Sequence, residues 1–107
     1  MSGSLGDMGN LLRQAQEMQR ELDRVRSELA RTTCEGTAGG GAVRVLVTGD
    51  RQVTQVDIAP EVLATQDKAL IEDLVLTALR DGGEKAGRLA REAIGKVTGG
   101  VSLPGLY

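Results

Sequence analysis

Several residue types that carry chemistry are rare or missing in this chain of 107 residues. It has no histidine, tryptophan or phenylalanine, one cysteine and one tyrosine. The absence of histidine removes the commonest general base and the commonest transition-metal ligand. With Tyr107 as the only aromatic residue, the chain lacks the rings on which single-stranded nucleic acids stack, and its core must consist of aliphatic side chains. The lone Cys34 cannot form an internal disulfide, which predicts a reducing compartment.

Long apolar runs are missing as well. No segment approaches the roughly 18 consecutive apolar residues of a membrane span, and no basic run followed by an apolar stretch opens the chain. These absences predict a cytoplasmic protein with no membrane partner. The formal net charge is only −2, which argues mildly against a nucleic-acid partner. The charge is uneven, however, because residues 34–79 are acidic whereas residues 80–107 carry an excess of basic side chains.

The remaining residues form no catalytic or phosphate-binding motif. Cys34 has no neighbour that would activate its thiol, so it is expected to be a buried strand residue. Residues 36–41 are rich in glycine, but a phosphate-binding loop would continue into Lys, Ser or Thr and a helix, whereas Ala42 and Val43 open a strand. A hairpin turn explains these glycines better. We therefore predict a protein that is not an enzyme, with no catalytic residue, metal, cofactor or small-molecule substrate.

The first quarter of the chain carries apolar residues at alternating spacings of three and four, which is the a/d pattern of a heptad repeat. This apolar stripe consists of Met8, Leu11, Ala15, Met18, Leu22, Val25 and Leu29. It predicts a helical arm over residues 7–31, capped by Asp7, after a loose segment at residues 1–6. A stripe of this width fits the seam between two packed helices, so we expect a homodimer of coiled-coil type. The alternative is that the helix lies on the chain's own sheet.

Residues 32–59 change to the alternating pattern that is typical of strands. Short turns at residues 39–41 and 49–50 divide this segment into three strands, which predicts an antiparallel meander. The clearest strand directs three valines to one face, namely Val43, Val45 and Val47. Val53 breaks the alternation of the last strand, which indicates a bulge.

A second long helix is expected over residues 67–95, followed by a tail at residues 96–107. Gly82 and Gly83 interrupt its apolar face, and each costs about 1 kcal/mol relative to alanine in a helix interior. We therefore expect a kink, a close contact or a break at this point. With a helical turn near residues 61–63, the chain is expected to form one α+β domain of the order α-β-β-β-α.

The side of the first helix that faces away from the apolar stripe carries a broken line of arginines. Its members, at heptad positions f and c, are Arg13, Arg20, Arg24 and Arg31. A second basic cluster near the end of the chain includes Arg88 and Arg91. Such lines suit a polyanion like DNA, but Glu17 and Asp23 interleave with the first line. Taken alone, these residues favour an ordinary solvated helix face over a DNA contact.

Four segments together carry a family resemblance. They are residues 11–19 (LLRQAQEMQ), 35–45 (EGTAGGGAVRV), 56–61 (VDIAPE) and 103–107 (LPGLY). In this order and at this spacing they resemble the YbaB/EbfC family of bacterial nucleoid-associated proteins. The resemblance spans nearly the whole chain, and the Gly82–Gly83 pair departs from it because helix formers are expected there.

The resemblance implies an α-β-β-β-α fold, a tweezer-like homodimer and cofactor-free binding of double-stranded DNA with little sequence preference. It also implies a nucleoid-associated protein that alters the conformation or organisation of DNA. The helical arms are implicated only in general, so the assignment of the six arginines named above to DNA binding is our hypothesis. The alternative function is a protein-interaction module that does not bind DNA and that engages another protein through its heptad arm or its tail.

Overall fold

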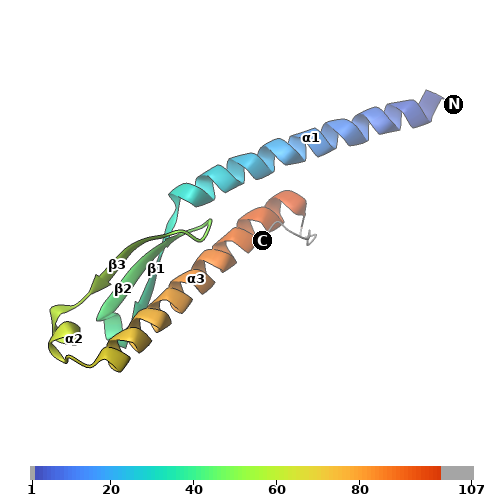
Figure 1. Ribbon diagram of the computed structural model, residues 1–107. Coiled ribbons are helices and arrows are strands. Elements are labelled where there is room, and N and C mark those ends of the chain that lie inside the picture. The colour runs from blue at the N-terminus through green and yellow to red at the C-terminus, as the bar shows by residue number, and fades with distance from the viewer. Residues whose placement is uncertain (1, 100–107) are drawn as a thin grey trace.

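The computed structural model describes residues 2–99 and contains the predicted order of elements (Figure 1). The elements are helix α1 (Ser2–Arg31), strand β1 (Thr33–Ala38), the short 3-10 turn η1 (Gly39–Gly41), strand β2 (Val43–Thr48), strand β3 (Val53–Ile58), helix α2 (Pro60–Ala64) and helix α3 (Lys68–Thr98). The molecule is slender, with extents of 77 × 20 × 17 Å, because α1 projects away from the layer formed by the sheet and α3. Residues 100–107 of the expected tail lie outside the described residues.

The first helix is longer than the sequence predicted. It begins at Ser2, so the expected loose segment at residues 1–6 is corrected for residues 2–6, and Asp7 is an interior residue rather than a cap. Residues 2–6 include Gly3 and Gly6, each of which costs about 1 kcal/mol in a helix relative to alanine, but they contain no proline, so every residue there can continue the helical hydrogen-bond pattern.

The last helix begins where the sequence predicted it and ends later. Asp67 caps it, because its side chain accepts a hydrogen bond from Leu70 N at 3.1 Å. The helix continues through Gly95 to Thr98 instead of ending at residue 95. It stops at Gly99, whose φ of 65° is the left-handed conformation that commonly terminates helices.

The three strands form one antiparallel sheet in the order β1-β2-β3. The turn between β1 and β2 has left-handed backbone at three glycines, Gly39, Gly40 and Gly41, with φ values of 62°, 68° and 94°. Glycine adopts this region without the steric cost that a β-carbon adds. The register between β2 and β3 shifts after Leu46, so that Val47 pairs with Val53. The predicted bulge is therefore confirmed.

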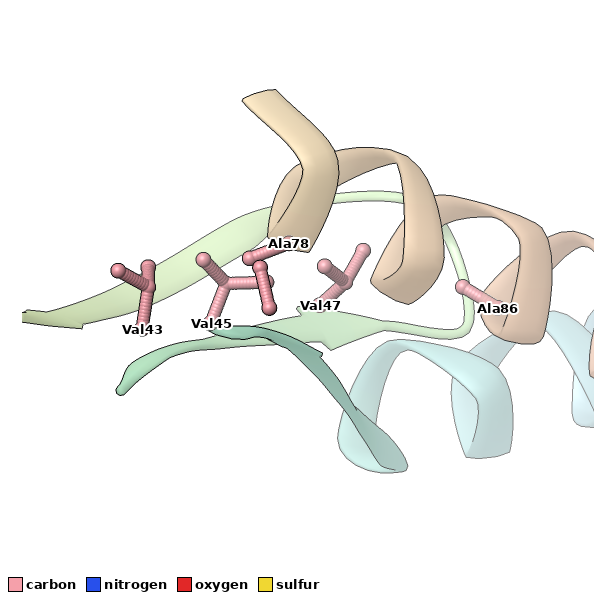
Figure 2. Close-up of a cluster of buried hydrophobic side chains, with 6 residues drawn as sticks. Val43, Val45, Val47, Ala78 and Ala86 are labelled. Carbon is pink, nitrogen blue, oxygen red and sulfur yellow. The ribbon is translucent and has the colours of Figure 1, made fainter. Parts of the chain in front are cut away.

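Helix α3 covers one face of the sheet and packs on β1 and β2. Figure 2 shows the core between them, in which the buried valines of β2 meet Ala78 and Ala86 of α3. The backbones of β1 and α3 lie close together at Gly36 and Gly82. A β-carbon at Gly36 would lie 2.2 Å from Ala78 O and 2.4 Å from Gly82 N. Of the outcomes expected at Gly82 and Gly83, a close contact is the one observed, and α3 runs through both glycines without a break.

The apolar stripe of α1 is divided between two environments. Its second half, with Leu22, Val25 and Leu29, forms a buried cluster with Ala90 and Ile94 of α3. Its first half lies on the projecting part of the helix (Figure 1), where the exposed members are Met8, Leu11, Ala15 and Met18. The second half thus faces a helix of the same chain. The sequence had predicted packing on the helix of a second copy or, as the alternative, on the chain's own sheet, and neither describes this contact.

Strand β3 is only partly covered. Its Val53 and Val56 pair with Val47 and Val45 of β2 and share their face of the sheet. Because α3 lies over β1 and β2, these two valines remain 51% and 48% exposed. We call this surface the open face of β3. The open face of β3 and the first half of the stripe are two apolar surfaces that the single chain leaves exposed to water.

Candidate nucleic-acid interface

Three members of the arginine line of α1 lie on the side that points away from α3. Because the second half of the apolar stripe faces α3, heptad positions f and c fall on the opposite side of the helix. Arg24 is the exception, because it lines a hollow between α1 and α3 together with Leu89 and Val97. All four members of the line, Arg13, Arg20, Arg24 and Arg31, are exposed. From Arg13 to Arg31 the helix rises about 27 Å at 1.5 Å per residue. This length can follow several phosphates of one DNA strand, which succeed each other about every 3.4 Å along the axis.

Arg24 differs from the other three members because two carboxylates of α1 hold its guanidinium group. It forms ion pairs with Glu21 and Glu28, the latter at 2.6 Å. The hydrogen bond to Glu21 is the main cause that raises the pKa of Arg24, and the same bond lowers the pKa of Glu21. Among the side chains that the structure describes, the other three members form no ion pair. A phosphate must compete with two carboxylates at Arg24 but not at the rest of the line.

The second basic cluster is divided by its contacts. Lys85 donates hydrogen bonds to Glu35 O of β1 at 3.0 Å and to the carboxylate of Asp81 at 3.1 Å. Asp81 also accepts a bond from Thr37 N at 2.9 Å. The bond from Thr37, followed by the bond from Lys85, lowers the pKa of Asp81. These contacts fasten α3 to β1, so Lys85 has a structural partner and is a weaker candidate for a phosphate.

Arg88 and Arg91 lie in a groove between α3 and the turn that joins β2 to β3. The groove has a volume of about 920 Å³, and its charged residues are Arg51, Arg80, Glu84, Arg88 and Arg91. We call it the arginine groove. Four guanidinium groups and one carboxylate leave an excess of three positive charges in a chain whose net charge is −2. The groove is therefore locally positive although the net charge of the chain is negative.

Two of the four arginines of the groove were not predicted from the sequence. Arg80 lies about two turns before Arg88 on one face of α3, so helical periodicity contained a signal that would have found it. Arg51 lies in the turn after β2, and its linear neighbourhood does not relate it to α3. Only the fold brings Arg51 to the groove.

Comparison with known proteins identifies the protein family of this chain. A sequence profile of the YbaB/EbfC DNA-binding family matches residues 5–101. The chain belongs to this family. A nucleoid-associated protein of Acetivibrio thermocellus is 42% identical over 103 residues, which cover 95% of this chain and 91% of the relative. A nucleoid-associated protein of Chloroflexus aurantiacus is 45% identical over 97 residues, which cover 91% and 95%.

Solved structures agree with the fold of this YbaB/EbfC protein. The crystal structure of the uncharacterized protein HP0035 from Helicobacter pylori matches with a TM-score of 0.72 at 22% identity, over 85% of this chain and 92% of that chain. The resemblance drawn from the sequence is thus confirmed, and the family to which the chain belongs is a DNA-binding family. Across residues 2–99, no helix is long and apolar enough for a bilayer, and no three His, Cys, Asp or Glu side chains gather to hold a metal ion.

Proposed function

We propose that this protein is a homodimeric nucleoid-associated protein that binds double-stranded DNA with little sequence preference and alters its conformation or organisation. The observation that carries the proposal is the line of exposed arginines on α1, of which Arg13, Arg20 and Arg31 form no ion pair among the described side chains. The YbaB/EbfC family match supports DNA as the partner. We infer a cytoplasmic, nucleoid-associated location. The proposed role involves no catalysis, cofactor, small-molecule substrate or membrane.

Weak sequence preference follows from the kind of contact that these residues make. Arginines spread along the outer face of a helix meet phosphates, and phosphate contacts position a protein on the duplex without reading its bases. Such binding is mainly electrostatic, so its affinity falls as salt rises. Arg24 contributes least to the proposed line because Glu21 and Glu28 compete for it. Arg88 and Arg91 add a second region of contact on α3.

Homodimer formation is supported by the two apolar surfaces that the chain leaves uncovered. The projecting stripe exposes Leu11 by 64%, and the open face of β3 exposes Val53 and Val56. A second copy that covers the projecting stripe removes apolar area from water, which stabilises the assembly. Val53 also lines the arginine groove, so the stripe is the surface whose coverage leaves that groove free. Light scattering at micromolar concentration is expected to give twice the chain mass of 11.2 kDa. A mass of one chain would contradict the dimer.

A mobility-shift experiment on unrelated duplexes tests DNA binding. The protein is expected to shift all of them at low salt, with affinities that fall in parallel as salt rises. Arg20→Gln is expected to weaken binding equally on every duplex. Arg44→Gln is the matched control, because Arg44 is an exposed arginine of β2 that lies outside both basic surfaces. Failure of the wild type to shift any duplex at low salt would refute the proposal.

The second candidate function is a protein-interaction module, which the exposed apolar end of α1 favours. Met8, Leu11 and Leu12 line a hollow on this end of the helix, and such a surface suits the apolar face of another protein. Affinity capture from nuclease-treated extract distinguishes the two functions. A specific protein partner, recovered by a chain that shifts no DNA, would favour the interaction module.

A further inference from the structure

The arginine groove holds two guanidinium groups from different elements above one glycine. A β-carbon at Gly87 of α3 would lie 3.0 Å from Arg51 Nη2 and 3.3 Å from Arg91 Nη1. Both groups therefore lie over Gly87, where their positive charges repel each other unless an anion lies between them. We propose that Arg51 and Arg91, with Arg88 beside them, bind a backbone phosphate of DNA over Gly87.

Within the described part of the chain, no carboxylate neutralises this pair. Asp50 is next to Arg51 in sequence, but it accepts a hydrogen bond from the hydroxyl of Thr48 instead. Glu84 is the one carboxylate of the groove, and it forms no ion pair with any of the four arginines. The positive charge of the groove can therefore bind an external anion, whereas the charge of Arg24 on α1 is neutralised by Glu21 and Glu28 of the same helix.

Arg51 occupies the left-handed position of the turn between β2 and β3. Its φ of 66° is in the left-handed region, which is unfavourable for residues with a β-carbon and which glycine or asparagine adopts more readily. Hydrogen bonds of the turn hold it there, because Arg51 N donates to Thr48 O at 2.8 Å and Gln52 N donates to Thr48 Oγ1 at 2.9 Å. A left-handed last residue is the ordinary geometry of a three-residue hairpin loop, and this geometry places Arg51 at the edge of the groove.

The shape of the groove suits the backbone of a DNA strand. Guanidinium groups bind phosphate through paired hydrogen bonds, so two of them can hold one phosphate from both sides. Gly87 places no side chain beneath the site, and a β-carbon at Gly83 would meet no atom within 4 Å, so the wall of the groove along α3 is open to a close approach. From Arg80 to Arg91 the helix rises about 16 Å, which spans several phosphates of one strand.

This inference deepens the proposed function and rests on it, because the assigned ligand is the phosphate backbone of duplex DNA. It adds Arg51 and Arg80 to the contact surface. It also extends the path of the DNA from the arm to the junction of α3 with the β2–β3 turn. One protomer then offers two separate regions of phosphate contact.

The test compares Arg51→Gln and Arg91→Gln with Arg44→Gln, which removes the same charge from a strand residue outside the groove. The affinity of the full chain for a labelled duplex is measured by fluorescence anisotropy over a series of salt concentrations. Loss of one phosphate contact is expected to lower the slope of log affinity against log salt by about 0.9 and to weaken binding about eight-fold at 0.1 M salt. Arg44→Gln is expected to retain the wild-type slope.

Circular dichroism establishes that each variant is folded, and Arg91→Gln, at an exposed helix position, keeps the test valid if Arg51→Gln does not fold. If both groove variants match Arg44→Gln while the wild type binds DNA, the groove assignment is overturned and the proposed function stands. The same holds if Arg20→Gln reduces the slope and the groove variants do not. If the wild type binds no duplex at low salt, the proposed function fails and the groove assignment fails with it.

Discussion

A glycine inside a helix lowers the helix propensity, but its missing side chain lets the helix pack closely on a neighbour. Alanine substitutions at Gly82 and Gly83 separate these two effects. Both substitutions gain about 1 kcal/mol of helix propensity. At Gly83 the new methyl group meets no atom within 4 Å, so the gain is retained. At Gly82 it lies 2.8 Å from Val47 Cγ2 and 3.2 Å from Val45 Cγ2, so α3 or these valines must shift.

Overpacking of this kind typically costs about 1 to 3 kcal/mol. Because the gain in helix propensity is the same in both variants, the difference between them isolates the cost of the contact. Gly83→Ala is expected to be more stable than the wild type by about 0.5 to 1 kcal/mol. Gly82→Ala is expected to be less stable than Gly83→Ala by about 1 to 3 kcal/mol, which separates their melting temperatures by about 4 to 12 °C.

Urea unfolding followed by circular dichroism measures this difference. All variants are compared at one protein concentration, because the stability of a dimer depends on it. Gly36→Ala serves as the severe case, since its β-carbon would lie 2.2 Å from the backbone oxygen of Ala78, and it is expected to destabilise the protein at least as much as Gly82→Ala. Equal stability of Gly82→Ala and Gly83→Ala would refute the account of the contact between α3 and the sheet.

Three further predictions concern other parts of the fold. Leu29→Ala removes a side chain from the buried cluster between α1 and α3 and is expected to cost about 2 to 4 kcal/mol in urea unfolding. Leu63→Ala, at a leucine of α2 that is 54% exposed, is the control, and an equal loss at both sites would contradict the burial of Leu29 against α3. Gly49→Ala places a methyl group 2.7 Å from Leu29 Cδ2. The amide of residue 49 donates hydrogen bonds to Leu29 O and Thr32 O at 2.9 Å, and we expect its hydrogen exchange to be faster in this variant. Unchanged protection of this amide would show that the contact tolerates a β-carbon. Because the pKa of Asp81 is lowered from 3.8 in the folded protein, its carboxylate stabilises the fold above about pH 4 and the contribution is lost as the pH falls through the folded pKa. The stability difference between the wild type and Asp81→Asn is therefore expected to shrink on acidification from pH 7 to pH 3, and a constant difference would argue against this role.

Local sequence patterns predicted most of the fold because they coincide with what the tertiary structure requires. The alternation of Val43, Val45 and Val47 matches a strand with one covered face, and these three residues are buried. The phase error at Val53 marks the register shift between β2 and β3. Gly82 and Gly83 predicted an irregular feature in α3, but helix propensity alone did not distinguish a kink from a close contact. Which of the two occurs depends on which glycine faces the sheet.

The parts that sequence reasoning missed depend on contacts between distant segments. The apolar stripe of α1 keeps one period from Met8 to Leu29, yet only its second half is buried against α3, because α3 ends before most of the projecting part of α1 (Figure 1). Arg51 reaches the arginine groove through a turn whose partner helix lies far along the chain. A one-dimensional pattern specifies which face of an element is apolar or basic, but not how far the neighbouring element extends.

A small rotation at the base of α1 causes a large displacement at the tip of its projecting half. From Ser2 to Leu22, where its buried contacts begin, the helix is about 30 Å long at 1.5 Å per residue. A rotation of about 10° at its base moves the tip by about 5 Å, more than the 3.4 Å between successive phosphates along a strand axis. The packing of a few aliphatic side chains at the base of α1 therefore determines the position of charges far beyond the body of the protein.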